Sequence, residues 1–277
     1  MKRKLIILTI VLSFLSSCSY IPFIGSKKEE KEEVNPELTY KKAESALMKK
    51  DYKEAQELFK KVLEQAPDSK IVENTRLNLA ESYYNSGDYE EAITVYEDYL
   101  KLYPLSPNSD YVMYKLGLCY YNLMRPPDRD QTYTLKAIET FKKLIENYPL
   151  SPWVGEARKK LKDCEERLAE HDIYVGKFYL KTEQYQSAEN RFTQAMKKSE
   201  NKNIKAEAKY LLCKTYEKKN EKDKAIKCYE ELIRDYPGWD YIDKAEEELA
   251  ILTGKKKSNI VENIKKEIKE DLLGIYK

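Results

Sequence analysis

The chain has 277 residues, and its 50 basic and 48 acidic side chains leave a formal net charge of only +2 at neutral pH. This balance gives no reason to expect a nucleic-acid partner. Eight glycines, a single histidine (His171, expected on the surface) and no plausible nucleophile–base pair argue against a catalytic site, a metal site or a bound cofactor, so we do not expect an enzyme.

The N-terminus predicts secretion and lipid anchoring. Three basic residues precede a short apolar run, Leu5–Leu15, which is too short for a permanent membrane helix and predicts a signal peptide over residues 1–17. The run ends in Leu15-Ser16-Ser17-Cys18, which resembles the lipobox of bacterial lipoproteins. This resemblance implies cleavage before Cys18, acylation of Cys18 and stable membrane attachment. An ordinary signal peptide with a chance cysteine is the alternative interpretation.

A charged tether and a helical repeat array follow the anchor. Residues 18–35 lack a periodic apolar pattern and predict a flexible tether. From Pro36 onward, one pattern recurs: a small residue in a first helix, an alanine in a second helix and an aromatic residue four positions later. The small residues are Ala43, Ala80, Gly117, Gly176 and Cys213; the alanine–aromatic pairs are Ala55/Phe59, Ala92/Tyr96, Ala137/Phe141, Ala188/Phe192 and Ala225/Tyr229.

This pattern matches the tetratricopeptide repeat (TPR), in which helical hairpins stack into a superhelix. We therefore predict an all-α fold of five helix-turn-helix repeats, at about residues 36–72, 73–109, 110–168, 169–205 and 206–252. The charged tail, residues 253–277, has Ile260, Ile264, Ile268 and Leu272 at four-residue spacing. That spacing favours an amphipathic helix, with a solvated, frayed tail as the alternative.

The third repeat is irregular. An insertion between Tyr121 and Ala137 contains Asp128-Arg129-Asp130, and an unbroken amphipathic stretch follows Pro152. Together with the lipobox, Asp110-Tyr111, Tyr148-Pro149-x-Ser151 and Arg167-Leu168-Ala169, this insertion resembles the BamD family over residues 15–250. These are the TPR lipoproteins of the outer-membrane β-barrel assembly machine.

The resemblance implies an adaptor on the periplasmic face of the outer membrane. Members of the family bind the transport domains of the barrel protein BamA and are thought to receive the C-terminal strand signal of unfolded outer-membrane proteins. Other lipoproteins of the machine are further candidate partners. By analogy, the C-terminal half, from about Lys177 to Leu252, is where BamA docks.

A peptide-binding groove is expected along the first helices of the early repeats, which line the concave side of a TPR array. Tyrosine suits such a groove because it gives a large contact area, a hydroxyl group and a low entropy cost. The alternative is that about half of these tyrosines only pack against neighbouring hairpins. The predicted groove residues are Tyr40, Glu44, Leu47, Leu77, Glu81, Tyr84, Tyr111, Tyr114, Leu118 and Tyr121.

Two further sets of residues have two interpretations each. Asp128, Arg129 and Asp130 are either a partner contact or a local ion-pair lock for the insertion. The four cysteines after Cys18 match no zinc motif and are expected at small apolar helix positions. The alternative is a Cys213–Cys228 disulfide, because the two residues fall on facing helices of one hairpin and the periplasm can oxidise thiols.

Two non-enzymatic alternatives to the barrel-assembly role stay open. A generic TPR lipoprotein scaffold for pilus or cell-wall assembly would share the lipobox and the repeats, but is not expected to contain the Asp-Arg-Asp insertion. The cell-division TPR protein would have a trimerising coiled coil and a non-lipid signal, and this sequence shows neither feature.

Overall fold

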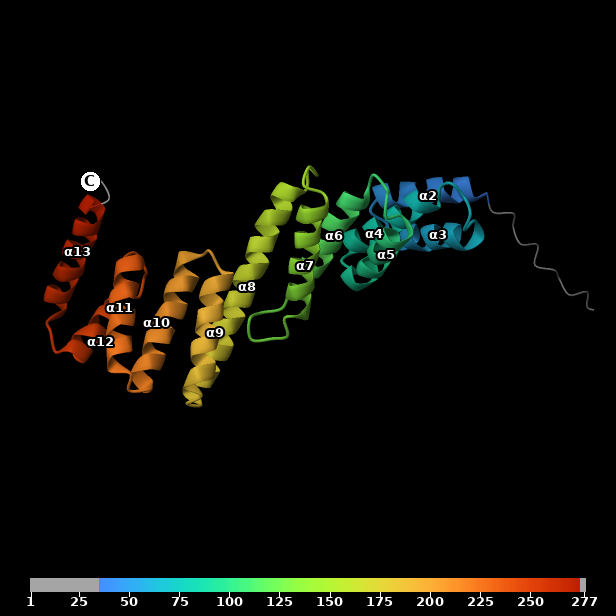
Figure 1. The fold of residues 1–277 in the computed structure, drawn as a ribbon. Helices are drawn as coiled ribbons and strands as arrows, with labels where there is room; N and C mark the ends of the chain where they lie inside the picture. Colours follow the sequence, from blue (N-terminus) through green and yellow to red (C-terminus); the bar gives the residue numbers. More distant parts are fainter. Residues whose placement is uncertain (1–34, 275–277) are drawn as a thin grey trace, which may run out of the picture.

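The computed structural model describes residues 35–274, and side chains up to Glu270. In this part of the chain all regular secondary structure is α-helical, and the helices pair into stacked hairpins (Figure 1). The predicted all-α TPR fold is confirmed. The helices are α2 (Pro36–Met48), α3 (Tyr52–Gln65), α4 (Val72–Ser86), α5 (Tyr89–Leu102), α6 (Ser109–Asn122), α7 (Thr132–Asn147), α8 (Val154–Lys181), α9 (Tyr185–Lys198), α10 (Lys202–Lys218), α11 (Lys222–Asp235), α12 (Ile242–Thr253) and α13 (Lys257–Gly274).

The predicted signal peptide, Cys18 and almost all of the tether lie outside the described residues. Among the helices that are described, none is long and apolar enough to span a membrane. The same residues, 35–274, also contain no group of three or more His, Cys, Asp or Glu side chains arranged to hold a metal ion.

Local sequence signals set where the hairpins begin and turn. Asn35 caps α2, where its Oδ1 accepts a hydrogen bond from the backbone N–H of Leu38 at 3.0 Å, and Pro36 follows as the first helical residue. Gly87 ends α4 with a φ of 89°, a left-handed conformation that glycine adopts without strain. Tyr103, Tyr148 and Tyr236 end α5, α7 and α11, each directly before a proline that cannot continue the helix.

Two of the hairpins close where a glycine of the first helix meets a phenylalanine ring of the second. A Cβ atom added to Gly117 would lie 2.5 Å from Cε1 of Phe141, and one added to Gly176 would lie 2.5 Å from Cε1 of Phe192. Both phenylalanine side chains are completely buried. The small residues of the first helices therefore allow the close helix approach that their spacing predicts.

Helix α8 departs from the regular pattern because it is 28 residues long. No helix ends near residue 168, so the predicted boundary between the third and fourth repeats falls inside α8. Its first part packs with α7 in the N-terminal core, where Ala157 and Cys164 are buried, and its second part packs with α9. The long, unbroken stretch that follows Pro152 in the sequence is thus one helix shared by two hairpins.

The C-terminal segment folds back onto the array. Ile260 and Ile264 on α13 are each 6 % exposed and belong to the same buried cluster as Leu249 of α12, so the predicted amphipathic helix is present. Lys257 ties α13 to α12 through an ion pair of 3.1 Å with Glu246. The described part of the tail is therefore a packed helix and not a frayed, solvated segment.

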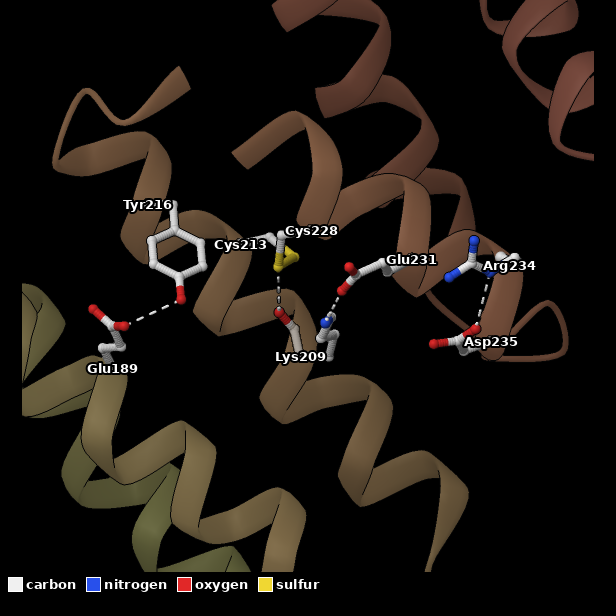
Figure 2. A network of polar contacts seen from close by, with 8 residues as sticks. All are labelled: Glu189, Lys209, Cys213, Tyr216, Cys228, Glu231, Arg234 and Asp235. Atoms are coloured by element: carbon white, nitrogen blue, oxygen red, sulfur yellow. Dashed lines mark hydrogen bonds and ion pairs between the residues drawn. A yellow bond between two sulfur atoms is a disulfide. The ribbon is translucent and has the colours of Figure 1, made fainter. Parts of the chain in front are cut away.

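Two of the four cysteines in the described residues form a disulfide. Cys213 of α10 and Cys228 of α11 are bonded, with their Cα atoms 5.3 Å apart (Figure 2). This corrects the expectation that these two residues are only small apolar positions. Cys119 and Cys164 are free and buried, and burial raises the pKa of each thiol to about 12, so neither is a reactive thiolate at neutral pH.

Candidate functional site

The predicted groove residues lie on neighbouring first helices that contact one another directly. All ten are half-buried, so each side chain keeps some access to solvent. Asn78 of α4 donates a hydrogen bond from Nδ2 to the hydroxyl of Tyr40 on α2 at 3.0 Å. Further along, the Tyr121 hydroxyl on α6 donates to Asp163 Oδ2 on α8 at 3.1 Å. The ion pair between Glu81 of α4 and Lys115 of α6 completes this row of contacts, so the predicted residues of α2, α4 and α6 share one face of neighbouring helices.

A buried lysine, which the sequence interpretation missed, lies at the centre of this face. Lys115 of α6 is 8 % exposed, and its Nζ lies 3.1 Å from Oε2 of Glu81 on α4. The same Nζ lies 3.4 Å from the ring centroid of Tyr84, a cation–π contact. The buried Tyr96 donates its hydroxyl to the other carboxylate oxygen of Glu81. Glu81 is therefore held between a cation and a hydroxyl donor, and cannot turn freely toward a ligand.

Three of the groove tyrosines, Tyr40, Tyr84 and Tyr111, have a raised pKa and keep their protons at neutral pH. Burial, followed by the nearby Glu44 carboxylate, raises the pKa of Tyr40 to about 12. Burial is also the main cause that raises the pKa of Tyr84 and of Tyr111, and for Tyr111 the carboxylate of Glu81 adds to it. At neutral pH these hydroxyls are hydrogen-bond donors, which suits the carbonyl oxygens of an extended peptide.

Trp153 closes the aromatic part of the face. Its ring stacks on Tyr114 with a centroid distance of 5.1 Å and an interplanar angle of 12°, and it lies 5.2 Å from the ring of Tyr111. Because Trp153 directly precedes α8, these contacts join α6 to the next hairpin. Several groove tyrosines therefore do pack against neighbouring helices, as the alternative interpretation holds, while their rings stay partly accessible.

The insertion is an ordered loop between α6 and α7, held mainly by Gln131 and not by the Asp-Arg-Asp residues. Gln131 is 6 % exposed, and its Nε2 donates to the carbonyl oxygens of Pro126 at 2.8 Å and Arg129 at 3.0 Å. Arg129 and Asp128 form only an exposed ion pair of 3.6 Å, which contributes at most about 1 kcal/mol. Asp130 accepts from the backbone N–H of Thr132 at 3.0 Å, at the start of α7.

His171 connects this loop to α8. The residue was expected on the surface, but it is half-buried, and its Nδ1 donates to the carbonyl oxygen of Pro127 at 2.6 Å. Figure 1 shows the loop from α6 to α7 running beside α8. Since 44 residues separate the two partners, the sequence pattern contained no signal for this contact.

Ion pairs and hydrogen bonds also connect the helices of the C-terminal half. Lys209 of α10 pairs with Glu231 of α11 at 2.5 Å, and the hydroxyl of Tyr216 donates to Glu189 of α9 at 3.1 Å (Figure 2). Lys214 pairs with Glu248 of α12 at 2.9 Å. The first two contacts join consecutive helices and the third joins α10 to α12; the sequence pattern predicts none of them.

The sequence profile of a protein family described as outer membrane lipoprotein, YfiO, matches residues 32–225. The chain belongs to this family. The resemblance to BamD proteins that the insertion and lipobox suggest is confirmed. The outer membrane protein assembly factor BamD of Rickettsia prowazekii is 29 % identical over 213 residues, which are 76 % of this chain and 85 % of that protein. BamD of Pasteurella multocida is 29 % identical over 224 residues, covering 77 % of this chain and 83 % of that protein.

Solved TPR structures give more distant matches. A TPR-repeat protein from Bacteroides fragilis is 16 % identical, covers 85 % of this chain and 98 % of its own, and has a TM-score of 0.42. The TPR2AB domain of yeast Sti1 is 18 % identical, covers 85 % of this chain and 96 % of its own, and has a TM-score of 0.40.

The YfiO match includes the groove helices, the insertion loop and all of α8, so the whole candidate site lies within the family region. It ends four residues into α11, and α12 and α13 lie beyond it. The family match therefore covers α2 to α10 and the first turn of α11.

Proposed function

We propose that the protein is a lipid-anchored adaptor for outer-membrane β-barrel assembly, attached through Cys18 and facing the periplasm. In this role it binds a BamA-like barrel protein and receives unfolded outer-membrane proteins at the groove of α2, α4 and α6. The observation that carries the proposal is the continuous face of partly exposed, protonated tyrosines in a chain of the YfiO family. Two relatives named as outer membrane protein assembly factors support it.

The groove fits an extended peptide that ends in an aromatic residue. Protonated tyrosine hydroxyls are able to donate to peptide carbonyl oxygens, and the Tyr111–Trp153–Tyr114 cluster offers ring surfaces for an aromatic side chain. Lys115 is paired with Glu81 and is therefore not available as a free cation for a terminal carboxylate. In this proposal, recognition depends on aromatic and backbone contacts and not on charge.

Affinity purification of the full-length lipoprotein from native membranes in mild detergent tests whether it binds a BamA-like barrel protein. We expect a barrel protein with tandem periplasmic transport domains to be recovered. Recovery of only pilus, cell-wall or cell-division proteins would reject the assignment and favour a scaffold of one of those assemblies.

If the groove binds the peptide, Tyr84→Ala and Tyr121→Ala should each weaken the affinity for a C-terminal strand peptide by roughly tenfold. The reason is that truncating a central aromatic contact removes on the order of 1–2 kcal/mol of binding free energy. The measurement is fluorescence anisotropy with a labelled peptide from a β-barrel outer-membrane protein. Tyr241→Ala is the matched control, since this tyrosine is 55 % exposed and lies beyond α11. Unchanged affinity in both groove variants would place the peptide site elsewhere.

A further inference from the structure

The second half of α8 has a face that no helix of the described chain covers. The turn at Tyr148–Trp153 reverses the chain, so α7 runs back along α8 from its N-terminal end. With 16 residues in α7 and a rise of about 1.5 Å per residue in both helices, α7 reaches only to about residue 170 of α8. Beyond that point α8 packs with α9 and α10, while Tyr174 and Phe178 on another side of it are more than half exposed.

In the first helices α4, α6 and α10, the equivalent face is buried by the preceding hairpin. The residue two positions after the small residue is Ser82 in α4, Cys119 in α6 and Thr215 in α10, and each is 0 % exposed. In these cases the second helix of the preceding hairpin packs against the first helix. The equivalent residue in α8 is Phe178, which is 58 % exposed, and Tyr174 one turn earlier is 52 % exposed.

The first hairpin provides an internal comparison. Helix α2 also has no preceding helix in the described residues, and its equivalent positions are Lys41 and Ser45, both exposed. Polar residues are what a terminal face of a repeat array requires to stay soluble. At the open face of α8 the same two positions are a tyrosine and a phenylalanine, two large aromatic side chains that are each more than half exposed.

The insertion loop borders this face. Pro127 accepts the hydrogen bond of His171, which lies one turn before Tyr174 on the same side of α8. The loop therefore contacts α8 at His171, while Tyr174 and Phe178 in the next two turns stay exposed.

We propose that the α8 shelf, defined as the exposed face of α8 with Tyr174 and Phe178, is a docking surface for an amphipathic helix of another protein. The occupant is a helix because an antiparallel helix covers the equivalent face of α4, α6 and α10, and α8 is a first helix of the same kind, with Gly176 against Phe192 as Gly117 of α6 is against Phe141. The chain's own amphipathic helix α13 does not occupy the shelf, because its apolar residues Ile260 and Ile264 are buried against α11 and α12. This inference holds whichever protein supplies the helix.

The test places the photo-crosslinking residue p-benzoylphenylalanine at position 174 or 178 of the full-length lipoprotein in native membranes, and at position 150 as a control. Leu150 is 97 % exposed and lies in the turn before α8, so it is accessible but outside the shelf. We expect adducts at 174 and 178 that are absent at 150. Mass spectrometry should map them to a segment of another protein with apolar residues at helical spacing.

A synthetic peptide of the mapped segment should then bind the purified protein, and Tyr174→Ser/Phe178→Ser should weaken its affinity at least tenfold. Leu150→Ser should leave the affinity unchanged. The double variant should keep the thermal unfolding midpoint, because both side chains are more than half exposed. Adducts to a second copy of this chain, to its N-terminal residues, to lipid or to an extended strand, or no adduct above the level at position 150, would overturn the proposal.

Discussion

Replacing Lys115 with methionine should lower the free energy of unfolding by roughly 3–5 kcal/mol, the usual cost of removing one partner of a buried ion pair. The substitution leaves the Glu81 carboxylate, whose side chain is 17 % exposed, without its cation, and it also removes the cation over the Tyr84 ring. Methionine occupies a similar volume, so the loss reflects charge and not a cavity. Urea unfolding followed by circular dichroism measures the effect.

A double-mutant cycle separates the ion pair from other contributions. In Lys115→Met/Glu81→Gln both charges are absent, while the glutamine oxygen still accepts the hydroxyl of Tyr96. We expect this double variant to be more stable than Lys115→Met alone, with a coupling of roughly 1–3 kcal/mol between the two sites. If Lys115→Met lies within about 0.5 kcal/mol of the wild type, which is the range of ordinary surface substitutions, the pair does not hold α4 to α6.

The repeat fold follows from short-range sequence patterns, and this explains why it could be predicted. Gly176 and Phe192 belong to one hairpin, and their TPR positions alone place them in contact. The Cys213–Cys228 disulfide also follows from hairpin geometry, but choosing it over two buried thiols required the helix separation, which the sequence does not contain.

Contacts between hairpins could not be predicted in the same way. Lys115 occupies a position that is Asn78 in α4 and Leu211 in α10, so its burial depends on a partner, Glu81, in the preceding hairpin. His171 meets Pro127 only because α8 continues past the end of α7. The sequence indicated a long helix after Pro152, but not which of its faces would be left open.

Phe192→Ala should be the most damaging single truncation in the second half of the array. The side chain is fully buried against Gly176, and emptying such a site costs roughly 3–5 kcal/mol. Because a repeat protein is stabilised by contacts between neighbouring hairpins, the loss should stay local. We expect α9 to α11 to lose protection in hydrogen–deuterium exchange while α2 to α6 keep theirs.

Phe59→Ala is the matched control, since Phe59 is equally buried in the first hairpin. It should produce the opposite pattern, with loss of protection in α2 to α4 and normal exchange in α9 to α11. Helix α8 contributes to two of the three buried clusters: Cys164 belongs to the N-terminal cluster, and Ala169 to a small cluster shared with α9 and α10. If either variant instead unfolds the whole array in one step, α8 transmits stability between the halves. A partner bound at the shelf would then stabilise the peptide groove as well, because ligand binding to one part of a cooperative unit stabilises all of it.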